Sequence, residues 1–261
     1  MRIVSLSPVV TETLVLLGLE DEVVGVTPWC KTYLNDASKE AVGTYRGILF
    51  DRLEKAKPDA VFLQSRVHDR MVDAVRSRGF NAYLVPLPTN IHSIISHVII
   101  DVGSIVGRYY EARELGEKLL GKISRVSERV RGLRRLKVYV EYLWPDKTFS
   151  SAGALTFIDD GVRIAGGENI FRDTPQEFFS PSNEEVARRN PEAILVNVEP
   201  SLKGLTVDEY RRIRRPLEDT KAFRENKVVL VKESRNANLA HFGPSFIDAV
   251  GWLSVEFDKL R

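Results

Sequence analysis

One pattern of thirteen residues occurs twice in this chain, and it limits the possible folds more than any other feature of the sequence. "DRLEKAKPDAVFL" occupies residues 51–63 and "EEVARRNPEAILV" occupies residues 184–196. Both copies begin with an acid, place an apolar residue two positions later and a proline seven positions later, and end on alanine and three apolar residues. Proline stops a helix, and a short continuous apolar run is typical of a strand buried in a parallel sheet. The repeat therefore predicts two α/β units of the same plan.

Strand and helix patterns alternate on both sides of a long amphipathic segment. Before it we expect strands at 2–6, 22–26, 60–63 and 81–85, and helices at 9–18, 50–57 and 69–78. After it we expect strands at 137–143, 193–198 and 227–231, and helices at 153–165, 182–189 and 244–259. From Tyr109 to Leu133, apolar residues recur every three or four positions, as on one face of a helix. We predict an α/β fold with an N-terminal lobe at 1–106, a rigid spacer helix at 107–134 and a similar Rossmann-like C-terminal lobe at 135–261.

Composition removes several classes of function. Lys and Arg number 38 against 36 acids, so the net charge of +2 gives no indication of nucleic-acid binding. The only cysteine, Cys30, cannot form a disulfide within the chain or supply a cysteine metal cluster. No apolar run reaches the length of a membrane span. If a leader has been removed, we expect an extracytoplasmic protein, and if this is the full-length chain, a cytoplasmic one.

The first predicted strand leads directly into a turn and a helix. Ile3 and Val4 favour a buried strand, Ser7 is a good N-cap residue, and Pro8 fits the first helical position. In an open α/β sheet, such a turn lies at the carboxyl end of the strand, where ligands bind. The turn has neither a phosphate-binding loop nor a GxGxxG pattern, so it does not predict a nucleotide site.

Six motifs carry a resemblance to a known class of proteins: "RIVSLSPVVTE" (2–12), "VVGVT" (23–27), "VGTYRG" (42–47), "KPDAVF" (57–62), "AGGENIFRD" (165–173) and "NPEAILV" (190–196). With these motifs in this order, the chain resembles the cobalamin-binding proteins of ABC importers. Their class, which also includes siderophore, haem and metal receptors, has two lobes joined by a rigid helix. The resemblance implies a ligand cleft between the lobes, no intrinsic cofactor, a large ligand such as cobalamin or an iron chelate, and an ABC permease dimer as partner of a monomer.

Aromatic residues are frequent on the loops that should form the cleft. Flat conjugated ligands stack on aromatic side chains, which lose little rotamer entropy on binding. By the resemblance, Tyr45 falls where a cobalamin-binding relative carries an aromatic residue, Phe178 falls near another, and Gln64 replaces an aromatic residue of some relatives. The alternative for each aromatic residue is packing within its own loop. The candidate aromatic ligand contacts are Trp29, Tyr33, Tyr45, Trp144, Phe178 and Phe242.

The polar residues of the same loops leave more than one interpretation open. His68 and His241 lie on loops of opposite lobes and could ligate cobalt or iron, although a loop histidine also serves as a hydrogen-bonding group. Arg66, with Arg46 and Arg235, could meet polar groups at the rim of a ligand. Cys30 could be a reactive thiolate or a small buried side chain. The spacing of histidines and acids does not predict a site for a bare metal ion.

Asp51 and Glu184 occupy equivalent positions in the two repeats, each at the head of a helix. By the resemblance, acids at these positions meet arginines on the two halves of a permease. The alternative is that they only stabilise their helix N-termini.

The sequence has neither a GxSxG elbow nor a glycine-rich phosphate turn, so we do not expect an enzyme. The predicted function is that of a substrate-binding protein which delivers a corrinoid or another large metal chelate to a permease. The alternatives are a cytoplasmic carrier or sensor of the same ligand and a two-lobed α/β enzyme.

Overall fold

The computed structural model describes residues 1–234 and 238–261, which separate into two compact units. Unit 1 comprises Met1–Pro88, His92–Leu119 and His241–Pro244. Unit 2 comprises Thr89–Ile91, the described residues of Leu120–Ala240, and Ser245–Arg261. The chain therefore returns to unit 1 for a short segment near its C-terminus. We predicted this segment as part of the C-terminal lobe, since it follows the strands of that lobe in the sequence. A return of the chain to the first unit leaves no signal in the sequence itself.

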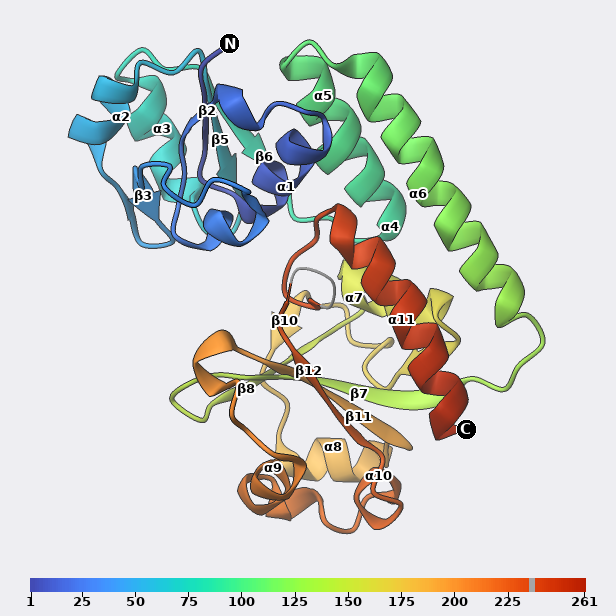
Figure 1. Cartoon of the computed structure of the whole chain (residues 1–261). Helices are drawn as coiled ribbons and strands as arrows, with labels where there is room; N and C mark the ends of the chain where they lie inside the picture. The colour runs from blue at the N-terminus through green and yellow to red at the C-terminus, as the bar shows by residue number, and fades with distance from the viewer. Residues whose placement is uncertain (235–237) are drawn as a thin grey trace. The chain divides into compact units, whose positions relative to one another are not determined.

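Unit 1 is built on a parallel sheet with the strand order β2-β1-β5-β6. Its strands are β1 (Ile3–Ser5), β2 (Val23–Gly25), β5 (Ala60–Gln64) and β6 (Ala82–Val85). Helices α2 (Phe50–Ala56) and α3 (Val72–Arg76) cover one face, and α1 (Pro8–Leu16) covers the other (Figure 1). Side chains of α2 and α3 pack with alternate residues of β1 and β5 in one core cluster. The carboxyl ends of these strands meet at one edge, which we call the unit 1 edge.

Helices α4 (Ile91–Ser93) and α5 (Asp101–Ile105) flank a π-helical segment at Ile94–Ile100. Helix α6 covers Tyr109–Arg129 of the helix that we predicted at 107–134. Its first half packs closely on α5, since a Cβ atom added at Gly103 would lie 2.2 Å from the Cβ of Ala112. The residues of α6 up to Leu119 group with unit 1 and those from Leu120 with unit 2. The role of this helix as a rigid spacer remains a prediction.

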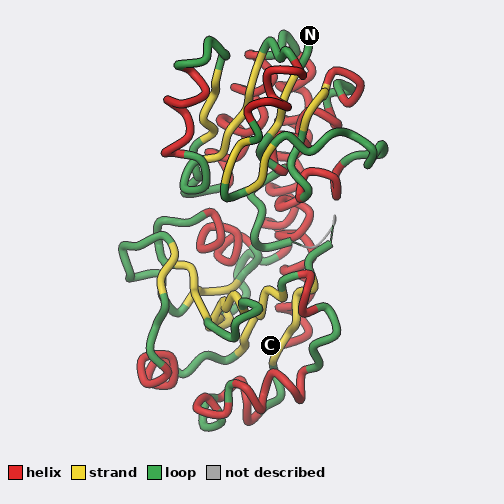
Figure 2. The backbone as a smooth tube through the Cα atoms, turned by 90° about the vertical axis from the view of Figure 1, so that its left-hand side faces the viewer, coloured by secondary structure: helices red, strands yellow, loops and turns green. Residues whose placement is uncertain are grey.

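Unit 2 has a mixed sheet with the strand order β10-β8-β7-β11-β12, and β9 pairs with the start of β7. Strands β7, β11 and β12 are parallel, whereas β8 and β10 extend the sheet in antiparallel fashion. The strands are β7 (Leu136–Leu143), β8 (Phe149–Ala152), β9 (Gly167–Asn169), β10 (Phe178–Phe179), β11 (Ala193–Val198) and β12 (Val228–Lys232). Figure 2 shows the strands of each sheet side by side.

Two layers of helices cover the sheet of unit 2 (Figure 1). One layer contains α8 (Asn183–Arg189), α9 (Val207–Ile213) and α10 (Lys221–Arg224), and the other contains α7 (Phe157–Ile164) and α11 (Pro244–Leu260). Tyr139 and Leu143 of β7 pack with Tyr210 and Phe223 in the first layer. Gly161 of α7 lies against Phe246 of α11 in the second. Both units are therefore Rossmann-like α/β layers, as predicted.

The repeat found in the sequence is also a repeat of local structure. Helix α8 begins 133 residues after the start of α2. Both helices end at a residue in the left-handed region, Lys57 with φ 44° and Asn190 with φ 48°. Strands β5 and β11 follow after the proline at the same offset. The first residues of these two strands, Ala60 and Ala193, are fully buried. The helix, the proline and the buried strand thus form as the pattern predicts.

The sequence did not reveal the short elements. The hairpin of β3 (Gly43–Thr44) and β4 (Gly47–Ile48) and the strands β8, β9 and β10 are too short to give a clear period-two pattern. The helix predicted at 153–165 is shorter, at Phe157–Ile164, because Thr156 caps it by accepting a hydrogen bond from the backbone N–H of Asp159. Among the described residues, none of the helices combines the length and the apolar composition that crossing a bilayer would require.

Candidate functional site

The exposed ring of Trp29 and the half-buried ring of Tyr45 meet at the unit 1 edge. Trp29 begins the 3-10 helix at Trp29–Tyr33 that follows β2, and Tyr45 lies in the two-residue turn between β3 and β4. Their ring centroids are 4.2 Å apart, with an interplanar angle of 37°. Trp29 keeps 39% of its surface exposed, which is unusual for so large an apolar side chain. The pair offers a flat apolar surface of the kind predicted for these two residues.

Beside this pair, the turn after β1 is fastened to the end of β5 by side chains. The Ser7 hydroxyl donates to Oε1 of Gln64 at 2.9 Å. The backbone N–H of Gln64 donates to Nδ1 of His68 at 3.2 Å, and Nε2 of His68 lies 3.3 Å from the carbonyl oxygen of Thr44. His68 is fully buried, and this burial lowers the pKa of its imidazole. Both nitrogens thus have protein partners, which favours a structural role over metal ligation.

His241, like His68, contacts an uncharged group of the protein. Its Nδ1 lies 3.0 Å from the hydroxyl of the fully buried Tyr33 in unit 1. Burial lowers the pKa of His241 to about 4, so the imidazole is uncharged at neutral pH. Phe242 keeps only 2% of its surface exposed. The described side chains therefore bring Tyr33 and His241 together, but the contact of Tyr33, His241 and Phe242 with a ligand remains a prediction.

A second aromatic group lies at the carboxyl end of β7 in unit 2. Trp144 stacks on Tyr142 with centroids 6.3 Å apart, and Phe178 of β10 meets the edge of Tyr142 at 5.6 Å. Trp144 and Phe178 each keep 42% of their surface exposed, and Nε1 of Trp144 donates to the Ser150 hydroxyl at 3.0 Å. Tyr142 is buried, and its hydroxyl donates to the carbonyl oxygen of Leu239. Tyr142 thus supports two predicted contact residues.

Tyr142 and Glu233 were not among the predicted site residues. Tyr142 looked like part of a buried strand, and only the pairing of β8 with β10 brings Phe178 next to it. Glu233 follows β12 at the same edge, and Asn197 donates to its Oε1 at 2.8 Å. Burial raises the pKa of Glu233 more than the Asn197 hydrogen bond lowers it. A carboxyl group with a raised pKa at a ligand-binding edge is a candidate contact for a polar ligand group.

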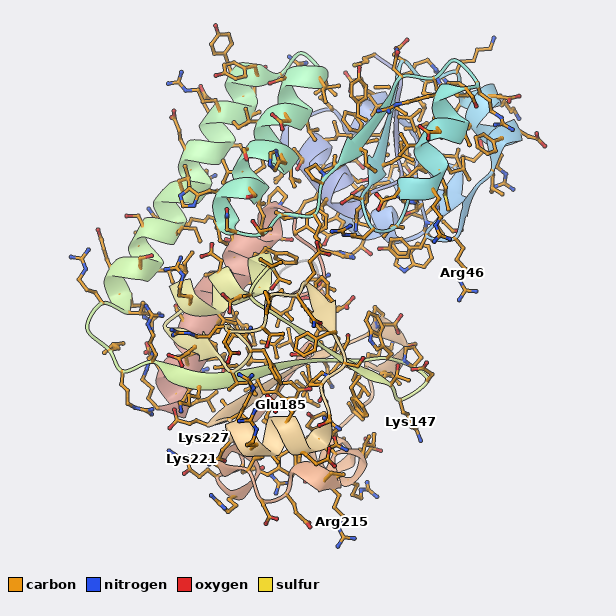
Figure 3. All side chains as sticks on the ribbon, turned by 180° about the vertical axis from the view of Figure 1, so that it is seen from behind. Arg46, Lys147, Glu185, Arg215, Lys221 and Lys227 are labelled. Carbon is orange, nitrogen blue, oxygen red and sulfur yellow. The ribbon has the colours of Figure 1, made fainter. Side chains whose placement is uncertain are left out.

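Other predicted residues lie outside these groups. Arg46, in the turn beside Tyr45, extends away from unit 1 (Figure 3). Arg66 has a left-handed backbone with φ 68°, and its N–H donates to Asp69. Cys30 is fully buried, and burial raises the pKa of its thiol, so it is a small buried side chain and not an exposed thiolate. Arg235 lies outside the described residues. The described part of the chain has no group of three or more His, Cys, Asp or Glu residues that could hold a metal ion.

The two predicted docking acids are exposed in the first turns of equivalent helices. Asp51 lies in α2 and Glu184 in α8. Neither forms an ion pair with another described residue, whereas the neighbouring Glu185 binds Arg188 and Arg189 at 2.6 Å. Hydrogen bonds from its own backbone N–H and from Ser182 lower the pKa of Glu184. Both side chains are therefore open to an external partner.

The sequence matches the family described as periplasmic binding protein over residues 3–234. A cobalamin-binding protein of Halobacterium salinarum is 25% identical over 235 residues, which cover 88% of this chain and 63% of that protein. A vitamin B12-binding protein of Yersinia pestis is 27% identical over 198 residues, covering 75% of this chain and 69% of that protein. The chain thus spans less than two thirds of the length of the archaeal relative.

Solved structures give the same architecture. A periplasmic haem-binding protein from Roseiflexus sp. RS-1 in apo form has a TM-score of 0.86 at 23% identity, covering 99% of this chain and 98% of that one. A periplasmic vitamin B12-binding protein of Vibrio cholerae has a TM-score of 0.80 at 18% identity, covering 99% and 97%. At these identities the likeness establishes the fold and leaves the ligand open.

Proposed function

The chain belongs to the periplasmic binding protein family, and from this premise we propose that it is a substrate-binding protein of an ABC importer. Its ligand is a corrinoid or another large metal chelate, such as haem or a siderophore, which exposed aromatic residues contact. Its role is binding and delivery to a permease, and not catalysis. The names of the cobalamin-binding, vitamin B12-binding and haem-binding relatives support this class of ligand.

The exposed aromatic side chains carry this proposal. Trp29 at the unit 1 edge and Trp144 and Phe178 in unit 2 keep about two fifths of their surfaces exposed, at 39%, 42% and 42%. Full burial of a large apolar side chain contributes about 1.5 to 3 kcal/mol, so covering the exposed two fifths of each residue would contribute about 0.6 to 1.2 kcal/mol. Trp29 and Trp144 lie beyond the carboxyl ends of β2 and β7, where open α/β sheets bind ligands, and Phe178 begins β10 beside Tyr142. A ligand with a large conjugated face would recover this energy by covering them.

Among the metal chelates, the state of the histidines favours a corrinoid. Haem iron needs an axial ligand from the protein, commonly an imidazole or a phenolate. Both nitrogens of the buried His68 have protein partners, and the half-buried His241 lies against the hydroxyl of Tyr33. A corrinoid with both axial positions filled needs only stacking and polar contacts. Haem is the second candidate, with the half-buried Tyr45 as the phenol that could ligate iron.

Titration of cyanocobalamin and of ferric haem into the protein by calorimetry tests the proposal. We expect Trp29→Ala and Trp144→Ala each to weaken binding by about 10- to 100-fold, as removal of a central aromatic contact does. Tyr110→Ala is the matched control, because Tyr110 is 74% exposed on α6, away from both strand edges. Absorbance spectra separate the candidates. A corrinoid bound without a protein ligand keeps its spectrum, whereas tyrosine-ligated haem changes its spectrum, and Tyr45→Phe abolishes that change.

Two results would reject this assignment. One is the absence of binding to corrinoids, haem and ferric siderophores alike. The other is that the Trp29→Ala and Trp144→Ala variants bind the ligand as tightly as the Tyr110→Ala control. The exposed aromatic residues would then have no part in ligand binding.

Asp51 and Glu184 are the proposed contacts to the permease. A two-fold permease presents two like basic patches, so its soluble partner needs one acid on each unit. The equivalent positions of the two acids, their exposure and the lack of a described ion-pair partner support this role. We expect Asp51→Arg with Glu184→Arg to abolish binding to the permease while the affinity for the ligand is unchanged.

The matched control for this charge reversal is Glu114→Arg with Asp219→Arg. Both residues are exposed acids outside the first turns of α2 and α8, and the change in net charge is the same. If the control pair weakens permease binding as much as the reversed pair, the effect is one of overall charge. If the reversed pair leaves binding intact, Asp51 and Glu184 only stabilise their helix N-termini.

A further inference from the structure

A solvent-open pocket of about 520 Å³ lies in unit 2 on the side of the β7–β8 hairpin opposite the exposed aromatic residues. Successive side chains of a strand point to opposite faces, so Leu143 points away from the face that carries Tyr142 and Trp144. Leu143 forms one apolar wall of this cavity, and Leu202, Leu205 and Ile213 form the others. We call this space the α9 cavity, because helix α9 and the segment before it close one side.

The charged residues of the α9 cavity differ in whether they already have partners. Glu209 completes a capping box, in which its carboxylate accepts hydrogen bonds of 2.9 Å from the backbone N–H and the hydroxyl of Thr206. The Lys147 side chain, at the tip of the hairpin, has no hydrogen-bond or ion-pair partner among the described residues (Figure 3). Among the same residues, the Arg212 side chain makes a long contact of 3.4 Å from Nε to the carbonyl oxygen of Asp208 and interacts electrostatically with Glu209, without a close ion pair. Two cations at the cavity therefore remain available to a ligand.

We propose that the α9 cavity binds an amphipathic organic anion, a small acid with an aliphatic or aromatic body. The volume lies within the range of small-molecule sites, and the four apolar walls suit a hydrocarbon body. Lys147 and Arg212 then hold the anionic group, and charge-assisted hydrogen bonds from such cations are stronger than those between neutral groups. This site is separate from the aromatic residues of the proposed function, and neither proposal requires the other.

Calorimetry of the whole protein with decanoate tests the site, and decylammonium serves as the probe with the same body and the opposite charge. We expect saturable binding of one decanoate and no comparable binding of decylammonium. Lys147→Ala with Arg212→Ala should weaken decanoate binding by at least about tenfold, the effect of losing one charge-assisted hydrogen bond. Lys203→Ala with Arg215→Ala, which also removes one lysine and one arginine, lies outside the cavity lining and should change binding less than twofold.

A second variant fills the cavity. Gly204 lines it, its φ lies outside the left-handed region, and a Cβ atom added there meets no atom within 4 Å. Gly204→Phe should therefore fold normally, as its circular dichroism spectrum will show, and abolish decanoate binding. Cyanocobalamin should not displace decanoate from the native protein. The proposal is overturned if decanoate does not bind, if decylammonium binds as tightly, or if Gly204→Phe and the Lys147/Arg212 variant bind decanoate as the native protein does.

Discussion

Unit 1 and unit 2 share the helix–proline–strand repeat, yet two histidines of unit 1 and two buried glutamates of unit 2 have different kinds of partner. In unit 1 burial lowers the pKa values of the fully buried His68 and the half-buried His241, and both imidazoles contact uncharged groups. In unit 2 the buried carboxylates of Glu141 and Glu192 are each held by basic side chains. The same Rossmann-like scaffold thus places neutral hydrogen bonds around these histidines in one copy and ion pairs around these glutamates in the other.

The ion pairs of unit 2 join its sheet to one helical layer. Glu141 lies in the middle of β7, and Arg214, which follows α9, donates to its Oε2 from NH2 at 2.7 Å. The Tyr210 hydroxyl donates to Oε1 at 2.8 Å, and NH1 of Arg214 donates to Asn183 at 2.6 Å. Glu141 and Arg214 are both buried. The repeat therefore sets the order of helices and strands in both units. The side-chain contacts that connect these elements differ from one unit to the other.

The largest effect that would test this contrast is the loss of Arg214. Arg214→Met leaves the Glu141 carboxylate buried without its cation, which costs about 3 to 5 kcal/mol of unfolding free energy. Burial already raises the pKa of Glu141 against the effect of Arg214, so the cost should shrink as the pH falls and the carboxyl group takes up a proton. Urea denaturation measures the loss of unfolding free energy. Hydrogen exchange, followed peptide by peptide, should show faster exchange in unit 2.

Arg215 provides the matched control for Arg214. Its side chain is 80% exposed, and Nε lies 3.5 Å from Glu218, so Arg215→Met should change the unfolding free energy by about 0.5 kcal/mol or less. The double variant Glu141→Leu with Arg214→Met should recover much of the loss, because an apolar pair of similar volume often replaces a buried ion pair at little cost. Equal effects of Arg214→Met and Arg215→Met would show that the buried pair does not hold unit 2 together.

The stability of the protein should depend on pH through His241 in unit 1. Burial lowers the pKa of this imidazole to about 4 in the folded protein, from 6.5 in the unfolded chain. Between these values the unfolded chain binds a proton that the folded chain does not, so the unfolding free energy falls as the pH falls from 6.5 towards 4. The shift corresponds to about 2 kcal/mol lost between pH 7 and pH 5. Denaturation at the two pH values measures this loss.

His241→Gln should remove that part of the pH dependence, because glutamine does not titrate and can still bond to the Tyr33 hydroxyl. His92→Gln changes an exposed histidine and should leave the native pH dependence in place. Above pH 6.5 the contribution of His241 is complete, so stability should be level there with respect to this residue. If His241→Gln retains the full loss between pH 7 and pH 5, the imidazole is not kept neutral by burial.

The sequence was sufficient for the repeated elements of both units. The proline at the end of α2 and α8, with the apolar run after it, predicted β5 and β11 at their observed positions, because local propensity and burial agree there. Trp29 was likewise placed correctly after β2, whereas its contact with Tyr45 depends on the short β3–β4 hairpin, which the sequence did not reveal. The parallel strands and main helices of each Rossmann-like layer follow from such signals.

The connecting groups were not predictable in the same way. An acid at position 141 inside an apolar strand signals a buried partner, but nothing local identifies an arginine 73 positions further along. The pairing of β10 with β8, which places Phe178 beside Tyr142, depends equally on a long-range register. The return of His241 to unit 1 is a third case. In each, the partner is fixed by tertiary structure and leaves no periodic trace in the sequence.

The smallest predicted effect compares the residues that end α2 and α8. Both Lys57 and Asn190 adopt positive φ, but asparagine tolerates this region and lysine does not. Asn190 also accepts a hydrogen bond of 2.8 Å from the backbone N–H of Lys221 at its Oδ1. Lys57→Gly should therefore stabilise the protein by about 0.5 kcal/mol through relief of strain, whereas Asn190→Gly should destabilise it by about 1 kcal/mol through loss of that bond. Lys57→Ala, which keeps the Cβ atom, should give no gain. Denaturation midpoints measured with all three variants decide the matter, and a gain in both glycine variants would mean that the two units end this helix for the same physical reason.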